Sequence, residues 1–357
     1  MLTDGHRRTP LAGLRPALVA AAALLLSGCY LAHVAAGQMR LSSRRTPIAR
    51  VLAAPDTGDD LRARLRYAQR ARGFAVGTLG LPDNGSYTSY VDVGRRYVTW
   101  NVIAAPVDSV EPKQWCFPIA GCVAYRGYFD EARARRYAAR LARRGYDVWV
   151  GPVPAYSTLG RLRDPLLSTM LRYRELDIAA LIFHELAHQV LYVPGDSAFN
   201  EAFATAVEYE GVRRWLAAEG GGGDLESFLA ERRRGFQVAD LIAESRERLR
   251  RIYEQRPPPQ ERDAARAAEF ARLRAAYDAL RLSWGASPGP DLFAADPTLN
   301  NARLAAYATY HQCLPGLERR LADLGHDLPA FFAEARRLAR LAPAERRALL
   351  CGADTVR

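Results

Sequence analysis

The sequence contains almost no lysine, and its many arginines are not concentrated in one place. Lys113 is the single lysine among 50 basic residues, and the formal net charge is +11. The arginines are scattered and interleaved with acids, as in Arg246-Glu247-Arg248, and form no basic stripe of the kind that nucleic-acid-binding proteins carry. We therefore expect no nucleic-acid partner. With 49% hydrophobic and 25% charged residues, the composition excludes a disordered chain and a collagen.

No hydrophobic run is long enough to cross a bilayer, which excludes a multispanning membrane protein. The run from Ala17 to Leu26 has ten residues, whereas a membrane-spanning helix needs about 20. It follows several arginines, and this order predicts a signal peptide over residues 1–28. Leu26-Ser27-Gly28-Cys29 comes next and resembles a bacterial lipobox, which implies that Cys29 is lipidated. The alternative is a soluble secreted protein with a chance cysteine at this position.

The rest of the chain is expected to consist of a lipid-anchored tether over residues 29–56 and one domain over residues 57–357. The length is ample for a domain with a sizeable core. Tyr30 follows the lipobox cysteine, where lipoproteins retained in the inner membrane often have Asp. The resemblance therefore implies the outer membrane, with the domain facing the periplasm.

Cysteine is scarce, with five residues in all, and an exported protein lies where disulfides persist. Cys116 and Cys122 flank Pro118 and Gly121, two turn formers, and we expect a disulfide that closes this loop. A zinc pair is the alternative, but no second pair of Cys or His residues has a matching spacing. Whether Cys313 and Cys351 pair is left open.

The residue pattern predicts an α+β fold. Residues 86–93, 97–104, 115–128 and 147–153 are rich in strand formers, and residues 59–73 and 130–144 have helical spacing. After residue 166 the chain is expected to be helical. The expected helices are 166–192, 198–218, 224–255, 261–283, 300–312 and 327–341. We expect a small mixed sheet at 86–153 that packs on an active-site helix, beside a larger helical region.

The segment Phe183-His184-Glu185-Leu186-Ala187-His188 contains the residues that predict chemistry. On a helix, His184 and His188 lie four residues apart and share one face, which suits two ligands of one zinc ion. Glu185 lies beside the first histidine, where it can accept a proton from a water molecule that the metal activates.

A second helix is expected to supply the third metal ligand. Pro194-Gly195 ends the first helix, and Asp196 or Ser197 can cap the next one. Glu201 lies at the start of that helix and completes a His, His, Glu set, which leaves the fourth position of a catalytic zinc open. Glu208 lies two turns later on the same face and can orient a ligand histidine through a hydrogen bond.

These two motifs resemble those of the gluzincin metallopeptidases. The pattern HExxH…NExFA matches His184-Glu185-Leu186-Ala187-His188 and Asn200-Glu201-Ala202-Phe203-Ala204. The resemblance implies a zincin-like fold, one Zn²⁺ per chain and a peptide or protein substrate. It also implies that Glu201 is the third ligand, that Asn200 supports the site, and that Glu208 has a counterpart in the M1 aminopeptidases.

A looser resemblance covers nearly the whole mature chain, to the bacterial lipoprotein family labelled "putative aminopeptidase". The matching segments are Trp115-Cys116-Phe117-Pro118, Tyr125-Arg126-Gly127-Tyr128-Phe129, Ala155-Tyr156-Ser157-Thr158-Leu159-Gly160 and Asn300-Asn301-Ala302-Arg303-Leu304. The Gly-x-Met-Glu-Asn motif with which M1 aminopeptidases grip the substrate amino terminus is missing. Aminopeptidase and endopeptidase activity therefore both remain open.

Two further segments are candidates for contact with the substrate. By resemblance, Ala155, Tyr156, Ser157 and Thr158 form the edge that pairs with substrate backbone, and the alternative is an ordinary strand-to-loop connection. Tyr310, with His311 second, is the candidate that stabilises the oxyanion. Its alternative is core packing.

The sequence therefore predicts a membrane-anchored zinc peptidase. Two other classes remain as alternatives. One is an envelope chaperone or assembly factor that binds peptides without cleaving them. The other is a basic surface-binding module, which requires no metal.

Overall fold

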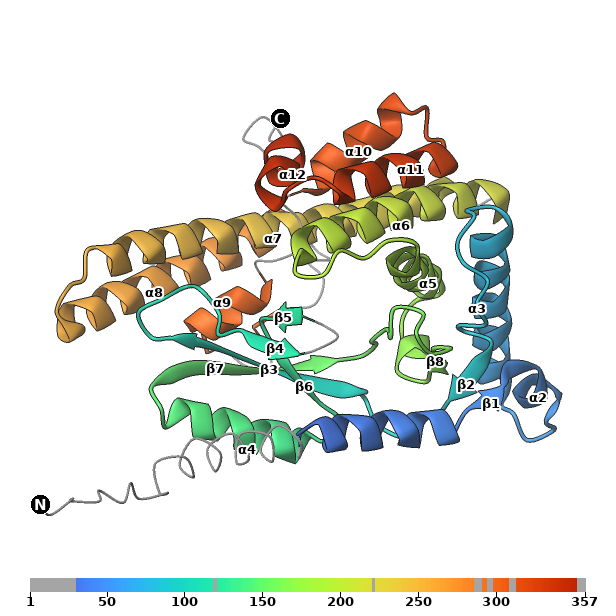
Figure 1. Ribbon diagram of the computed structural model, residues 1–357, viewed down its shortest axis with the longest axis horizontal. Helices are drawn as coiled ribbons and strands as arrows, with labels where there is room; N and C mark the ends of the chain where they lie inside the picture. Colours follow the sequence, from blue (N-terminus) through green and yellow to red (C-terminus); the bar gives the residue numbers. More distant parts are fainter. Residues whose placement is uncertain are drawn as a thin grey trace, which may run out of the picture. The chain divides into compact units, whose positions relative to one another are not determined.

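The computed structural model describes residues 30–117, 121–219, 222–285, 291–293, 298–307 and 313–351 (Figure 1). The chain divides into two compact units, Met1–Arg44 and Arg45–Arg357. In the first unit, residues 30–43 form a helix. Within the ranges given above, no helix combines the length and the apolar character that crossing a membrane requires.

The second unit has an α+β fold, as expected, and begins with a small mixed sheet. β1 (Thr46–Pro47) pairs antiparallel with β2 (Ser89–Val91), and β2 pairs parallel with β8 (Leu166–Leu167). Helices α2 (Ile48–Ala53) and α3 (Asp59–Gly77) lie between β1 and β2 in the chain. The expected strand over residues 86–93 is thus reduced to three residues in the structure.

A second sheet is antiparallel and carries helices on its faces. β3 (Thr99–Pro106) lies between β6 (Arg126–Tyr128) and β7 (Tyr146–Val153). Helix α4 (Glu131–Ala142) packs below this sheet and the short helix α9 (Asn301–Tyr307) packs above it (Figure 1). β4 (Trp115–Phe117) and β5 (Gly121–Val123) form a separate hairpin, which the Cys116–Cys122 disulfide crosses.

Helix α5 (Glu175–Val190) packs mainly against α6 (Ser197–Glu219) and α3. The ring of Phe183 lies 6.2 Å from that of Phe74 and 6.5 Å from that of Trp215. Gly211 allows α6 to approach closely, because a Cβ there would lie 2.8 Å from the Phe183 ring. This packing fixes α5 just before its first histidine.

The helix predicted over residues 166–192 starts later than expected. Leu166 pairs with Tyr90 in the first sheet, and a 3-10 turn (Met170–Arg172) follows before α5 begins at Glu175. The two-residue strand therefore replaces the first turns of the predicted helix.

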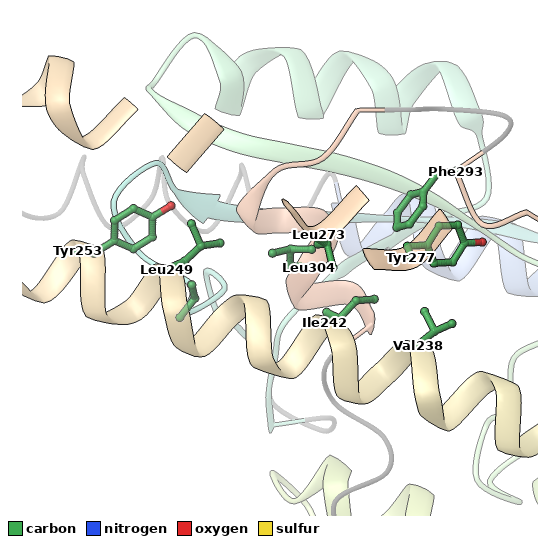
Figure 2. Packing of buried hydrophobic residues seen from close by; sticks show 9 residues of the cluster. Val238, Ile242, Leu249, Tyr253, Leu273, Tyr277, Phe293 and Leu304 are labelled. Carbon is green, nitrogen blue, oxygen red and sulfur yellow. The ribbon is translucent and has the colours of Figure 1, made fainter. Parts of the chain in front are cut away.

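Helices α7 (Gly222–Glu254) and α8 (Pro259–Ser283) correspond to the helices expected over residues 224–255 and 261–283. They form a hairpin that turns at the prolines Pro257 to Pro259. Figure 2 shows the apolar contacts that hold the hairpin on α9, among them those of Leu249 and Leu304. Tyr253 donates a hydrogen bond to Asn301, which in turn donates to the Pro106 carbonyl in β3. The hairpin is thus connected to the second sheet.

Three short helices end the described chain. They are α10 (Leu314–Asp323), α11 (Leu328–Ala339) and α12 (Pro343–Leu350), of which only α11 was expected. Cys313 forms a disulfide with Cys351, a pairing that the sequence left open. Arg346 of α12 is buried against Asp196, at the start of α6.

Candidate metal centre

His184 and His188 lie one turn apart on α5 and share the face that the helical spacing predicts. Their Nε2 atoms are 3.1 Å apart, and their rings are nearly perpendicular. The side chains are mostly buried, with 17% and 8% of their surface exposed. Because polar ring nitrogens are costly to bury without a partner, the arrangement calls for a shared third group.

Glu201, at the start of α6, supplies the next donor. Its carboxylate oxygens lie 3.3 Å from Nε2 of His184 and 3.6 Å from Nε2 of His188. Asp196 accepts a hydrogen bond from the backbone N–H of Phe199 and caps the first turn. The tight loop that joins α5 to α6 therefore turns Glu201 back onto the two histidines.

Asn200 holds this loop in place. Its side-chain nitrogen donates a hydrogen bond to the carbonyl of Val193, and its side-chain oxygen accepts one from the N–H of Val193. Both hydrogen bonds are 2.8 Å long. The side chain is buried. Both ends of the Asn200 amide thus bond to the loop just before α6.

The three donors fit a zinc ion in spacing and in kind. Zinc bonds of about 2.0–2.1 Å in a tetrahedron place neighbouring donors about 3.3 Å apart. The two Nε2 atoms are 3.1 Å apart, Oε2 of Glu201 lies 3.3 Å from Nε2 of His184, and Oε1 of Glu201 lies 3.6 Å from Nε2 of His188. Two imidazoles and one carboxylate also form a donor set of catalytic zinc sites, which leave one position open. These residues can therefore hold a metal ion.

The charges in this cluster favour a cation. Burial alone would lower the pKa of His184, but hydrogen bonds to Glu201 and Glu208 outweigh it and raise the pKa to about 10. Burial alone would raise the pKa of Glu201, but its hydrogen bonds to His184 and His188 hold that pKa well below the ordinary value. Positive charge is thus stabilised at the point where the donors converge.

Glu208 lies behind His184, on the side away from Glu201. Its Oε2 is 3.0 Å from Nδ1 of His184, and its Oε1 accepts a hydrogen bond of 2.8 Å from Arg232. With the proton on Nδ1, His184 donates to Glu208 and keeps the lone pair of Nε2 free for a metal. By contrast, Nδ1 of His188 is buried with no hydrogen-bond partner among the described residues.

Glu185 is placed next to the first ligand and has a perturbed acidity. Burial raises the pKa of its carboxyl, and the negative charges of Glu201 and Asp164 add to this effect, whereas both histidines oppose it. A carboxylate with a raised pKa is a better general base near neutral pH than an ordinary one.

The segment from Ala155 to Thr158 lies in a loop after β7 rather than in a strand. Ser157 and Thr158 donate side-chain hydrogen bonds to the buried carboxylate of Asp164. The Tyr156 ring packs edge-on against Phe129. Two hydroxyls of the predicted substrate edge are thus occupied by contacts within the loop, and its role toward substrate stays a prediction.

Some predicted site residues lie outside the described residues. These are Cys29, the predicted lipid attachment site, and Tyr310 and His311, the candidates for oxyanion stabilisation. Their roles stay predictions.

The structure also shows residues that the sequence patterns did not indicate. Arg232 of α7 bonds Glu208, and Asn84 donates a hydrogen bond of 2.6 Å to Gln189, which follows His188. Gly160 packs against the side-chain amides of Asn84 and Gln189, since a Cβ there would lie 3.0 Å from Asn84 Nδ2. Arg232 is one of many arginines on a long charged helix, so no local signal distinguishes it.

No curated protein and no solved structure shows significant similarity to this chain. A family model described as "Putative aminopeptidase" matches residues 29–350, which include both helices of the metal centre. The chain therefore belongs to this aminopeptidase family.

Proposed function

We propose that this protein is a zinc-dependent peptidase whose metal is held by His184, His188 and Glu201. The observation that carries the proposal is the convergence of two imidazole nitrogens and one carboxylate within 3.1–3.6 Å of one another, with Glu185 adjacent to the first histidine in the sequence. Membership of an aminopeptidase family supports the reaction class.

Metal analysis of the purified full chain tests the ligand set. We expect one zinc per chain in the wild type and far less in Glu201→Ala. Glu254→Ala is the matched control, because Glu254 is exposed at the end of α7. Equal zinc content in Glu201→Ala and the control would contradict the assignment.

Each residue of the site has a separate task in peptide hydrolysis. When bound, Zn²⁺ supplies Lewis acidity, which stabilises charge on the carbonyl oxygen and makes water more acidic. Glu208 orients His184 by accepting its Nδ1 proton. Glu185, adjacent to the first ligand, accepts the proton of the attacking water and passes it to the leaving amine.

We propose aminopeptidase rather than endopeptidase activity, on the strength of the family. Amino-acid amides and the same compounds with acetylated amino groups separate the two activities. An aminopeptidase requires the free amino terminus and loses activity on the acetylated series. An endopeptidase instead cleaves internally quenched peptides whose ends are both blocked.

We also propose that the mature chain is anchored to the outer membrane through a lipid on Cys29, with the peptidase domain facing the periplasm. The lipobox at residues 26–29 supports this proposal. Metabolic labelling with a fatty acid tests it. We expect label in the wild type and none in Cys29→Ala, and an unlabelled wild type would refute the anchor.

A further inference from the structure

The carboxylate of Glu208 is held from two sides. One oxygen lies 3.0 Å from Nδ1 of His184, and the other accepts a hydrogen bond from Arg232. Only 9% of the Glu208 side chain is exposed. Because both oxygens have partners, the orientation of this carboxylate depends on Arg232 as well as on His184.

Arg232 comes from outside the two helices that carry the metal-binding motifs. It lies on α7, 24 residues after Glu208, and its guanidinium packs 4.8 Å from the centre of the Phe228 ring. The same guanidinium lies 4.0 Å from Asp177 in the first turn of α5. The neighbouring Glu231 bonds Arg174, just before α5. Helix α7 is thus attached to the active-site helix by two adjacent ionic contacts.

The local charge gives Arg232 a specific role. Glu201 and Glu208 lie on the Nε2 and Nδ1 sides of His184, and Arg232 supplies a permanent positive charge on the Nδ1 side, next to Glu208. Its hydrogen bond fixes one Glu208 oxygen and leaves the other to accept from His184. This arrangement favours the tautomer of His184 whose Nε2 lone pair points to the metal.

We propose that Arg232 is a positioning residue of the metal centre, which acts through Glu208 to keep His184 ready to bind the metal. The inference rests on the metal site proposed above. It also makes the α7–α8 hairpin part of the support of the active site, through one side chain that neither motif contains.

Zinc affinity, measured by competition with a chromophoric chelator, tests the proposal. Mutating a residue that hydrogen-bonds a metal ligand typically lowers metal affinity 10–100-fold. Because Arg232 acts one residue further away, we expect the lower end of this range, a loss of about 10-fold, for Arg232→Met. Arg232→Lys should retain most of the affinity, because Arg232 reaches Glu208 through a single nitrogen, which an ammonium group can replace. Arg233→Met is the control, since Arg233 is exposed and its ion pair with Glu226 is 3.6 Å long.

A double-mutant cycle separates positioning from a general structural role. If Arg232 acts through Glu208, Arg232→Met should cost almost nothing in a Glu208→Ala background. The visible spectrum of the Co²⁺-loaded protein should change in Arg232→Met and stay unchanged in Arg233→Met. Additive losses in the cycle, or a wild-type spectrum and affinity in Arg232→Met, would overturn the inference. A wild type that binds no zinc would instead refute the metal site itself.

Discussion

Replacing Arg346 by methionine removes the side chain that joins the last helix to the start of α6. Arg346 is 2% exposed, and its Nε and terminal nitrogen both bond Asp196, at 2.9 and 2.5 Å. The other terminal nitrogen donates to the carbonyls of Leu338, Ala339 and Leu341, at 3.4, 3.1 and 3.1 Å. One buried guanidinium therefore closes the end of α11 and neutralises the residue that caps α6.

The expected cost is that of breaking a buried ion pair. Methionine fills much of the same space, but it leaves Asp196 as a mostly buried charge without its partner and removes the donor to three carbonyls. Removing one partner of a buried pair costs about 3–5 kcal/mol. We expect the free energy of unfolding of Arg346→Met to fall by this amount.

Denaturant titration of the wild type and the variant measures the change. Arg347→Met is the matched control, because Arg347 is the exposed neighbour on the same helix, and an exposed substitution changes stability by about 0.5 kcal/mol or less. A loss below about 1 kcal/mol, well under the range for a broken buried pair, or equal losses in the two variants, would refute this reasoning.

Two further predictions concern α6. Gly211→Ala should lower the free energy of unfolding by about 1–3 kcal/mol, because its Cβ would lie 2.8 Å from the Phe183 ring. The control is Gly235→Ala on α7, where a Cβ meets nothing within 4 Å, and this change should stabilise the fold by about 0.5–1 kcal/mol. The reverse order in denaturant titrations would contradict the packing. Burial alone would raise the pKa of Glu210, but hydrogen bonds from Arg213 and Arg214 outweigh it and hold the pKa below the ordinary value of 4.5. A lowered pKa stabilises the fold above the unfolded-state pKa, and this stability is lost as the pH falls through the folded-state pKa. The stability advantage of wild type over Glu210→Gln should therefore shrink as the pH falls below 4.5. An advantage that persists unchanged in acid would show that the carboxylate is not the cause.

The local parts of the site could be predicted from the sequence. The spacing of His184 and His188 fixes their common face once a helix forms, and Glu201 follows in a motif only 13 residues from the second histidine. Glu208 was predicted for the same reason, because it lies two turns after Glu201 on one helix.

Contacts between distant segments could not be predicted in this way. Arg232 meets Glu208 because α7 packs across the site, and Arg346 meets Asp196 over a separation of 150 residues. The predicted start of the helix at residue 166 was wrong for a related reason, because Leu166 pairs with Tyr90 in a sheet and this pairing competes with helix formation. The spacing of residues within one segment does not indicate which distant segment it will contact.

The proposed zinc peptidase is tested most directly by comparing the full wild-type chain with Glu185→Gln for zinc content and for hydrolysis of amino-acid amides and internally quenched peptides. Glu185 is not among the predicted ligands, so both proteins should contain one zinc per chain. Loss of a general base should lower hydrolysis by about 10²–10⁴-fold. A wild type without zinc would contradict the metal site, and a Glu185→Gln variant that hydrolyses peptides at the wild-type rate would contradict the role of Glu185 as general base.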